Sequence, residues 1–477
     1  MINKSIWNIK QNNVCDSLKK DLNTDVLIIG GGITGLSTAY HLKDSNLKVT
    51  LVEKNEICSG VTSKSTGKLT YLQENIYSKI NMYHGIKKTK EYLESQKYAI
   101  KLVTDIINNN NIDCNLEKSS SYIFSNTKNL DKEIDLLRKI GVSLYESNKF
   151  PNNIKNTHCA YVEDTYVLNP TKYVYGLKDI CLDKIDIYEN TKIIDIKRNN
   201  NLFICKTPNN TITAKYVIMA AHYPYFIIPF FFPLKTHLEK SYIKASMVNK
   251  NYYFNSITID NPKISTRYYE DNDATYQIYL NNSHNMAIKD NYKKNFKNIL
   301  NSKIDYIWSN KDIITNDYLP FIGHLKHNLF IGTGYNTWGI TNGSLAGKIL
   351  ADSILNKKNK YINLFNPKRN INLGKIINTP IILGSNVYSF IKSKIIKQKK
   401  WYPNNIRFEK RNGKNIAIYI DENKKEHIVY NLCPHLKCSL LFNEIEKTWD
   451  CPCHGSRFDI DGKSIEGPSN YNITYKG

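Results

Sequence analysis

The sequence predicts an α/β fold built on a parallel sheet, followed by a small all-β domain toward the C-terminal end. The first part of this prediction rests on a buried-strand pattern, Val26–Ile29, that leads directly into Gly30–Gly35 and a helix-like stretch to Leu42. The second part rests on two boxes of cysteine and histidine, Cys433–Cys438 and Cys451–Ser456, set among short strand-like and turn-like segments. A chain of 477 residues suits two or three domains.

The glycine-rich segment has the spacing G-x-G-x-x-G at a strand-to-helix turn. Gly30, Gly32 and Gly35 permit a tight turn and close backbone approach, so a pyrophosphate can lie on the helix N-terminus. The next strand ends in Glu53, whose carboxylate is placed to hydrogen-bond a ribose, and Lys54 beside it is a further candidate. Together these features predict a dinucleotide site. A glycine-rich turn without a ligand is the alternative.

NAD and FAD share this motif, and three further segments favour FAD. Residues 60–68 supply hydroxyls where the pyrophosphate and ring of a flavin dinucleotide would pass, and residues 217–222 resemble the strand that ends under FAD. Residues 329–334 and 338–343 form a strand-to-helix junction, whose helix N-terminus would stabilise negative charge on a reduced flavin. The further FAD-binding candidates are Ser63, Ser65, Thr66, Ile193, Ala221, Gly334, Gly339, Ile340 and Thr341.

The two C-terminal boxes each offer one thiolate and one imidazole, from Cys433 and His435 and from Cys451 and His454. The pattern C-x-H-x15-C-x2-H matches a Rieske [2Fe-2S] site, in which two histidines replace two cysteines on one iron. A Cys2His2 zinc site is the alternative, because zinc takes the same donors. However, C-x-H is not the usual zinc-finger opening, and zinc would not account for the second cysteine in each box.

The chain resembles bacterial FAD-dependent oxidoreductases of the D-amino-acid-oxidase superfamily that carry a C-terminal Rieske domain. Beyond the two motifs, the resemblance lies in Ser5–Trp7, Asn169–Tyr173, Ala221–Pro224, Trp308, Asp312, Pro320 and the Trp338 loop. It implies a glutathione-reductase-like FAD domain with an inserted antiparallel α+β substrate domain and an appended all-β Rieske domain. The expected boundaries are 1–356 for the flavoprotein part, with substrate segments roughly at 80–185 and 225–310, then a linker at 357–400 and the Rieske domain at 401–477.

The same resemblance assigns roles around the cluster boxes. The spare cysteines, Cys438 and Cys453, correspond to the disulfide that ties the two cluster loops together in Rieske proteins, and Gly467-Pro468 corresponds to the loop that covers the cluster. Two residues depart from the pattern. Lys437 stands where Rieske proteins often have glycine, and Phe458 stands where high-potential members have tyrosine.

Several segments have a clear periodicity between the motifs. The spacing over Lys87–Asn108 predicts a helix, whereas Cys114–Phe124 and Ile185–Val217 are β-rich. The strand-like interval Tyr242–Tyr279 is expected to form part of a substrate-domain sheet.

The chain is strongly basic, with 66 Lys and Arg residues against 43 Asp and Glu and a net charge of +23. Lysine is spread along the whole sequence, so a generally basic solvated surface is the simplest interpretation. The functional alternative is a steered encounter with an acidic electron-transfer protein such as a ferredoxin or flavodoxin. No groove-reading motif accompanies the charge, which argues against nucleic acid as a partner.

The sequence also predicts a cytoplasmic protein without a transmembrane segment. The first twenty residues contain no apolar core of signal-peptide type, and the longest apolar run, Tyr225–Leu234, is short and interrupted by Pro229 and Pro233. Cysteines outside the cluster boxes have no framework spacing and are expected to be reduced thiols. They are Cys15, Cys58, Cys114, Cys159, Cys181 and Cys205.

Joining a flavin to a one-electron cluster predicts an FAD-dependent oxidoreductase. It would couple two-electron chemistry on a small organic substrate, such as an amine or amino acid, to one-electron transfer through the cluster, and electron flow in either direction fits the residues. The alternatives are a non-enzymatic electron-transfer or redox-sensing protein, and an oxygen-using oxidase with a vestigial cluster. Catalytic residues are not identified. His222, Tyr242, Lys244 and Arg267 are candidates, but a structural role is preferred for His222, and surface or packing roles explain the other three at least as well.

Overall fold

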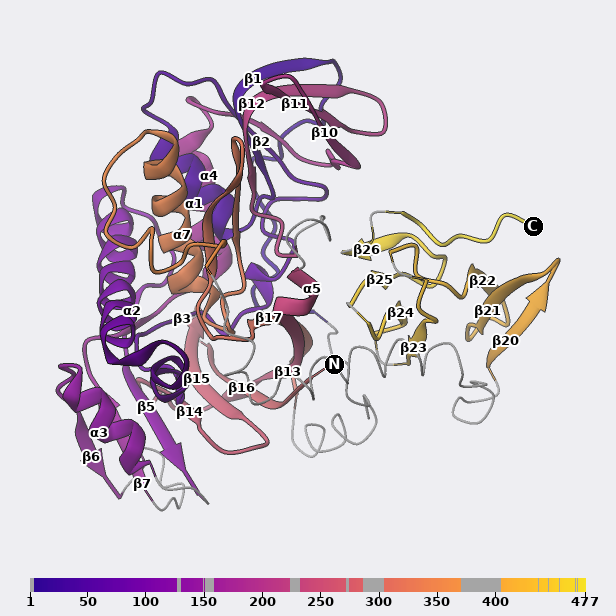
Figure 1. The fold of residues 1–477 in the computed structure, drawn as a ribbon. Coiled ribbons are helices and arrows are strands. Elements are labelled where there is room, and N and C mark those ends of the chain that lie inside the picture. Colours follow the sequence, from indigo (N-terminus) through magenta and orange to yellow (C-terminus); the bar gives the residue numbers. More distant parts are fainter. Residues whose placement is uncertain are drawn as a thin grey trace. The chain divides into compact units, whose positions relative to one another are not determined.

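The structure is a computed structural model that divides into two compact units (Figure 1). The first unit holds residues 1–222, 240–283 and 299–375, and the second holds residues 223–239, 284–298 and 376–477. The described residues are 4–126, 130–148, 150, 158–223, 232–271, 274–285, 304–369, 405–435, 437–444, 446–453, 455–467, 469 and 471–477.

The first unit contains the parallel sheet that the glycine motif predicts. Its strand order is β10-β11-β12-β1-β2-β9, with β19 beside β12 and β18 beside β19. The parallel strands are β1 (Leu22–Ile29), β2 (Val49–Val52), β9 (Asp186–Tyr188), β12 (Thr211–Met219) and β19 (Leu329–Thr333). The antiparallel edges are β10 (Asp195–Asn199), β11 (Leu202–Lys206) and β18 (Phe321–Lys326). Val26–Ile28 are fully buried, because a central parallel strand is covered on both faces.

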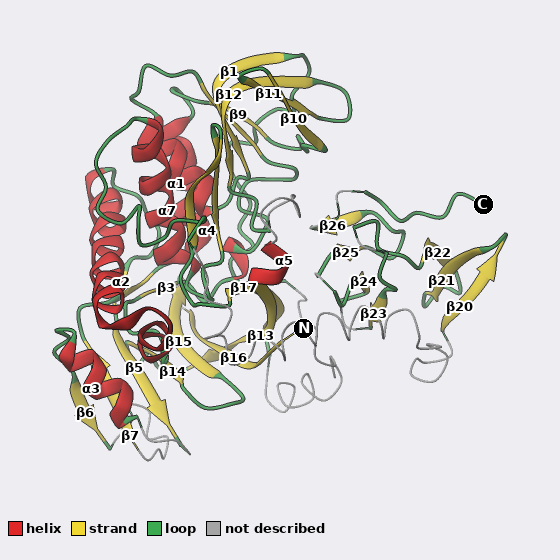
Figure 2. Cartoon of the chain, in the orientation of Figure 1, coloured by secondary structure: helices red, strands yellow, loops and turns green. Residues whose placement is uncertain are grey.

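Helices α1 (Ile33–Leu42), α4 (Pro170–Cys181) and α7 (Gly339–Ile354) lie beside this sheet (Figure 2). The contact between α1 and α7 depends on a glycine, since a Cβ at Gly347 would lie 2.4 Å from the Ser37 Oγ. The Ser37 hydroxyl donates across the same contact to the Ser344 carbonyl at 2.9 Å. No helix in the described ranges has the length and apolar character needed to span a membrane.

The second sheet of this unit is the mostly antiparallel sheet expected for the inserted domain, and its order is β17-β13-β16-β15-β14-β5-β7-β6. Its strands are β5 (Ser120–Ser125), β6 (Tyr145–Ser147), β7 (His158–Val162), β13 (Thr236–Val248), β14 (Phe254–Thr258), β15 (Ile264–Asp271), β16 (Ala274–Asn285) and β17 (Tyr306–Thr315). A small sheet joins β3 (Lys68–Leu69), β8 (Tyr166–Val167) and β4 (Glu117–Lys118). Among the described residues, the remaining helical elements are η1 (Thr62–Lys64), α2 (Ile76–Asn109) and α3 (Asp131–Lys139) in this unit, and α5 (Phe232–Lys235) in the second unit.

Helix α2 contains the helix predicted over Lys87–Asn108 and extends it toward the N-terminus. Gly85, with φ of 78°, interrupts the helical backbone, so α2 is two helical segments joined at a kink.

The C-terminal domain is all-β, as predicted. One antiparallel sheet contains β20 (Ile406–Arg411), β21 (Lys414–Ile420) and β22 (Glu426–Tyr430), and another contains β23 (Leu441–Asn443), β24 (Thr448–Asp450), β25 (Arg457–Phe458) and β26 (Ser464–Glu466). Trp449 is fully buried against the Phe442 ring, with centroids 4.6 Å apart. The buried Arg457 guanidinium lies 3.2 Å from Asp450 and 3.0 Å from Glu446, so ion pairs close the core beside the aromatic rings.

Of the predicted linker, residues 370–400 lie outside the described residues, whereas residues 357–369 pack within the first unit. Arg369 makes two 2.7 Å hydrogen bonds to the Asp317 carboxylate and donates to the Pro320 carbonyl at 2.8 Å. Burial opposes ionisation of Asp317, but Arg369 and His84 together hold its pKa far below the usual range. The chain through Arg369 is therefore anchored to the flavoprotein part.

The buried carboxyl group of Glu133 should make the stability of the protein depend on pH. Its carboxylate, on α3, accepts from the N–H groups of Tyr77 (3.2 Å) and Ser78 (3.0 Å) in the first turn of α2, and burial raises its pKa to about 7. A raised carboxyl pKa contributes stability that is fully present below pH 4.5 and is lost as the pH rises through 7. As the pH rises from 4.5 to above 7, the free energy of unfolding of wild type should fall by roughly 3 kcal/mol relative to that of Glu133→Gln.

Urea unfolding at pH 4.5 and 7.5 measures this difference, with Glu94→Gln at an exposed position of α2 as the control. An equal pH response in wild type and Glu133→Gln would contradict the assignment.

Candidate flavin and iron-sulfur sites

The predicted flavin-binding residues converge at one edge of the parallel sheet. Gly30 follows β1, Glu53 follows β2 and Ala221 lies two residues after β12, while Ile193 and Gly334 follow β9 and β19. These five strands run parallel, so their carboxyl ends meet at the same edge. Ligands of open α/β sheets bind outside this edge.

The glycine turn leaves no room for side chains. Gly30 has φ of 116°, and a Cβ there would lie 2.6 Å from the Ala220 carbonyl oxygen. A Cβ at Gly35 would lie 1.9 Å from the carbonyl oxygen of Gly30. Gly32 is the N-cap residue of α1 and has no side chain of its own, while the Thr62 Oγ1 accepts from the Ile33 N–H at 3.2 Å. The turn therefore has the shape of a cradle for a pyrophosphate.

Glu53 is held in place by backbone hydrogen bonds. Its Oε2 accepts from the Gly31 N–H at 2.8 Å, and its Oε1 accepts from the Asn55 N–H at 3.0 Å. A carboxylate has about four acceptor positions, so both oxygens keep capacity for ribose hydroxyls. Lys54 follows in the chain and is half-buried.

The loop over residues 62–67 is held through its own carbonyl groups by a tryptophan of β17 and a tryptophan of the N-terminal segment. The Trp308 indole N–H donates to the Lys64 carbonyl at 2.9 Å, and the Trp7 indole N–H donates to the Ser65 carbonyl at 2.7 Å. Among the predicted hydroxyls, the Ser63 Oγ donates to the Gly60 carbonyl at 3.2 Å, and the Ser65 Oγ accepts from the Gly67 N–H at 3.1 Å. Backbone contacts thus set the position of the loop.

Arg267 fixes the end of the same loop. Its Nη1 donates to the carbonyls of Thr66 (3.0 Å), Gly67 (2.9 Å) and Leu168 (2.9 Å), and its Nε donates to the Tyr268 carbonyl at 3.1 Å. The side chain is 1% exposed, and burial lowers its pKa to about 10, so it stays charged at neutral pH. The structure therefore gives Arg267 the packing role that the sequence left open.

The loop after β19 is strained where it enters α7. Gly334 has φ of 74°, and the non-glycine residues Asn336 and Thr337 have φ of 51° and 73°. A β-branched residue rarely adopts this conformation, and such strain often accompanies functional sites. The Asn336 Oδ1 accepts from the Thr315 N–H at 2.8 Å, which ties the loop to β17. The predicted flavin-binding residues Gly339–Thr341 form the first turn of α7 directly after it.

A buried polar network, which no sequence motif predicted, supports that first turn. The Gln96 Nε2 donates to the Asn342 Oδ1 at 2.9 Å, and the Gln73 Nε2 donates to the Gln96 Oε1 at 3.0 Å. The Tyr92 hydroxyl donates to the Gln73 Oε1 at 2.8 Å. All four side chains are fully buried. The available signal was a glutamine at a core-facing position of a predicted helix.

The remaining catalytic candidates have different surroundings. The His222 carbonyl accepts from the Thr333 hydroxyl, and its φ of 57° marks the sharp turn after β12. Side chains alternate along a strand, so Tyr242 and Lys244 lie on the face of β13 opposite Ile243 and Ala245. Ile243 and Ala245 pack with Trp7 and Trp308, whose indoles bond the loop over residues 62–67.

In the C-terminal domain, three of the four predicted cluster ligands are described. The thiols of Cys433 and Cys451 are 0% and 1% exposed. Burial lowers the pKa of His435 to about 4, so its imidazole is neutral at pH 7, the form that binds a metal. His454 lies outside the described residues. Two buried cysteines and a neutral imidazole fit a cluster with mixed thiolate and imidazole ligands.

The two cluster loops have the same backbone pattern. In the first, the Cys433 N–H donates to the Cys438 carbonyl and the Lys437 N–H donates to the Cys433 carbonyl, both at 2.8 Å. The second loop repeats both bonds from Cys451, at 2.8 and 2.9 Å. The fifth residue of each loop is left-handed, with φ of 57° at Lys437 and 71° at Gly455. The fifth position therefore favours glycine, and lysine occupies it in the first loop.

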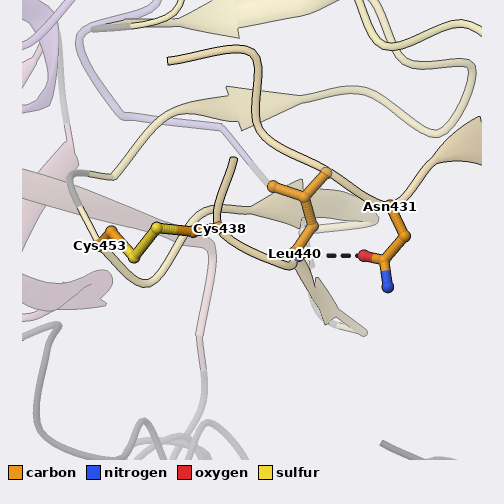
Figure 3. The surroundings of a disulfide bond; sticks show 4 residues. All are labelled: Asn431, Cys438, Leu440 and Cys453. Carbon is orange, nitrogen blue, oxygen red and sulfur yellow. Dashed lines mark hydrogen bonds between the residues drawn. A yellow bond between two sulfur atoms is a disulfide. The ribbon is translucent and has the colours of Figure 1, made fainter. Parts of the chain in front are cut away.

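Cys438 and Cys453 form a disulfide between the two loops, with Cα atoms 6.6 Å apart (Figure 3). Both residues are buried, and nearby the Leu440 N–H donates to the Asn431 Oδ1 at 3.0 Å. Of the predicted covering loop, Pro468 lies outside the described residues. The Ser469 N–H, directly after it, donates to the Ser456 Oγ at 2.9 Å and so ties that segment to the second cluster loop.

The six cysteines outside the cluster boxes carry thiols. Burial raises the pKa of Cys58, Cys114, Cys181 and Cys205 to about 12 in each case. These four are therefore protonated and unreactive at neutral pH.

The fold and the two sites define a flavin-dependent oxidoreductase joined to a Rieske domain. Residues 25–353 match the family model for FAD dependent oxidoreductases, and residues 392–475 match the model for the Rieske [2Fe-2S] domain. The chain therefore belongs to the FAD-dependent oxidoreductase family and is an enzyme. Its first domain binds FAD, and its C-terminal domain binds a [2Fe-2S] cluster rather than zinc.

Similar proteins share one or both parts. YhfW of Bacillus subtilis is named as a Rieske 2Fe-2S iron-sulfur protein. It is 28% identical over 95% of this chain and 93% of its own length. Escherichia coli gamma-glutamylputrescine oxidoreductase is 23% identical over 71% of this chain and 85% of its own. Glycine oxidase from Geobacillus kaustophilus, 17% identical, has the same fold with a TM-score of 0.59, over 73% of this chain and 100% of its own.

Two glycine substitutions compare a crowded position in the glycine turn with an exposed glycine elsewhere in the domain. Gly35→Ala places a methyl group 1.9 Å from a backbone oxygen, so the turn must shift and FAD affinity should fall at least about tenfold. Gly60→Ala meets no heavy atom within 4 Å and should retain its flavin. Flavin released from equal amounts of purified protein measures the difference, and full occupancy in Gly35→Ala would contradict the cradle.

Lys437 provides a second test. Lys437→Gly relieves a left-handed lysine and should stabilise the C-terminal domain by about 0.5–1 kcal/mol, after allowance for the greater chain entropy of glycine. It also removes a positive charge from the loop of two cluster ligands, so the cluster potential should fall. Lys447→Gly, at φ of 52° in another turn of the domain, is the matched control. It should give a similar gain in stability and a smaller change in potential, and equal changes in potential would refute the charge effect.

Proposed function

We propose that this enzyme oxidises a small amine or amino acid at its flavin and passes the electrons singly through the Rieske cluster to an external acceptor. Bound FAD accepts two electrons at once and can release them one at a time, whereas a [2Fe-2S] cluster carries one. The observation that supports this proposal most directly is the presence of both sites in one chain. Five flavin-site segments converge at one sheet edge, and two matched loops present cluster donors.

The proposed assignments are those expected from the amino-acid sequence. The FAD-dependent domain extends over residues 1–356, with substrate segments roughly at 80–185 and 225–310, and a linker at 357–400 precedes the Rieske domain at 401–477. FAD contacts are proposed for Gly30, Gly32, Gly35, Glu53, Lys54, Ser63, Ser65, Thr66, Ile193, Ala221, Gly334, Gly339, Ile340 and Thr341. Cluster ligation is proposed for Cys433, His435, Cys451 and His454.

Two observations support the choice of substrate and acceptor. Two of the similar proteins have names that state an amino compound as substrate, gamma-glutamylputrescine for one and glycine for the other. The net charge of +23 would attract an acidic electron-transfer protein. An external acceptor of this kind fits an enzyme that releases electrons one at a time.

Anaerobic spectroscopy of the purified protein tests the proposal. We expect acid to release FAD, dithionite reduction to give a Rieske-type EPR signal, and an amine or amino acid to bleach the flavin before the cluster is reduced. FAD with zinc and no EPR signal would refute the electron path. Stoichiometric hydrogen peroxide in air without a protein acceptor would indicate an oxygen-using oxidase instead.

Replacement of one histidine ligand separates the two half-reactions. His435→Cys substitutes a thiolate for a neutral imidazole, so the cluster potential should fall and reduction of a one-electron acceptor should slow at least about tenfold. Substrate bleaching of the flavin should keep its wild-type rate and is the internal control. Rapid mixing under anaerobic conditions measures both rates, and equal losses would contradict a path from flavin to cluster.

A further inference from the structure

Several buried polar atoms in the first unit have no hydrogen-bond partner among the described residues, and two of them lie on neighbouring strands of the antiparallel sheet. These two are the Oγ of Ser241 and the Oδ1 of Asn310, in residues that are 4% and 6% exposed. Ser241 lies on β13 and Asn310 lies on β17, which are neighbouring strands of the antiparallel sheet. Burial of an unsatisfied polar atom lowers stability, so two such atoms on adjacent strands call for an explanation.

Both side chains lie on the same face of the sheet. Ser241 shares its face of β13 with Ile243 and Ala245, because side chains alternate along a strand. Asn310 shares its face of β17 with Trp308 for the same reason. Ile243, Ala245 and Trp308 belong to one hydrophobic cluster, so these residues face the same interior.

Two loops with predicted flavin contacts attach to β17 on either side of Asn310. The first is the loop over residues 62–67, and the second is the loop between β19 and α7. Two residues before Asn310, the Trp308 indole donates to the Lys64 carbonyl of the first loop at 2.9 Å. Three residues after Asn310, the Ile313 carbonyl accepts from the Asn336 N–H of the second loop at 3.2 Å. A strand advances about 3.3 Å per residue, so these two attachments lie roughly 17 Å apart along β17. Asn310 lies between them.

The chemistry of the pair favours a ligand that donates hydrogen bonds. The Asn310 Nδ2 donates to the Asp312 Oδ2 at 3.2 Å, which orients the amide and leaves Oδ1 as an acceptor. The Ser241 hydroxyl can also accept. An amine nitrogen supplies N–H donors, whereas a carboxylate or an ether oxygen supplies none.

We propose that Ser241 and Asn310 bind the nitrogen of the substrate, and that the substrate is accordingly an amine with at least one N–H group. This inference rests on the proposed oxidation of an amine and assigns the residues that recognise it. The sequence candidates on β13 were Tyr242 and Lys244, which lie on the other face of that strand. The pair is a binding subsite and transfers no proton or electron.

The first part of the test compares an amine with its oxygen analogue. Holoenzyme is mixed anaerobically with L-proline, N-methylglycine and putrescine, and the amine that bleaches the flavin fastest is carried forward. Its matched analogue has oxygen in place of the amine nitrogen, for example tetrahydrofuran-2-carboxylate for L-proline. In Ser241→Ala and Asn310→Leu, the dissociation constant of the amine should rise about tenfold, as for a lost hydrogen bond to a charged group. That of the analogue should stay within about twofold.

The second part of the test measures stability. Neither atom has a partner among the described residues, so Ser241→Ala should keep or raise the melting temperature of the ligand-free holoenzyme. Ser121→Ala is the matched control, because the Ser121 hydroxyl is buried in the same sheet and bonded at 2.9 Å to both Thr165 and Asn255. That variant should melt at a lower temperature and bind the amine as wild type does.

The outcomes distinguish this inference from the proposed function. If no amine bleaches the wild-type flavin, both are overturned. If wild type is bleached and Ser241→Ala binds the amine normally, the subsite is overturned while the function stands. Altered flavin content or flavin spectrum in the variants, with unchanged amine affinity, would assign the atoms to the flavin and would also overturn the subsite. Ser241→Ala removes a single oxygen, so the result does not depend on whether Asn310→Leu folds.

Discussion

The structure of the first unit depends on one buried cation, the Arg267 guanidinium. A charge in a protein interior is stable only when its hydrogen-bonding groups are satisfied, and here backbone carbonyls from three separate segments satisfy it. Its guanidinium carbon also lies 5.3 Å from the centre of the Trp7 ring and 5.8 Å from that of Tyr269. If the antiparallel sheet moved away from the loop over residues 62–67, the buried guanidinium would lose its hydrogen bonds to the carbonyls of Thr66 and Gly67. Arg267 therefore holds the antiparallel sheet and the end of the loop over residues 62–67 together.

The sequence predicted features whose determinants are close together in the chain. The G-x-G-x-x-G turn needs only a strand, six residues and a helix, and the Cys433 and His435 box needs only a few residues. Contacts between distant segments were not predictable in this way, because Arg267 and Thr66 are far apart in the chain and only the folded sheet brings them together. Tyr242 shows a related limit. Alternation along β13 was recognisable, but which of its two faces turns toward the flavin loop depends on the neighbouring strands.

The C-terminal domain shows how a departure from a pattern acquires a physical meaning. Rieske proteins often have glycine where this chain has Lys437. The structure shows why glycine is favoured there, because both cluster loops make the same two backbone hydrogen bonds and have a left-handed residue at this position. The ion pairs of Arg457 with Asp450 and Glu446 had no local signature. They arise only when the strands around the second cluster loop come together.

The burial of the Cys438–Cys453 disulfide has a consequence for the oxidation states that this protein can hold. Thiol–disulfide exchange requires a thiolate to reach a sulfur atom in line with the bond, and these residues are 0% and 8% exposed. The buried thiols elsewhere in the chain are also protected, because they remain protonated. A bonded pair and several reduced cysteines can therefore coexist in one chain. Steric access therefore determines which sulfur atoms exchange.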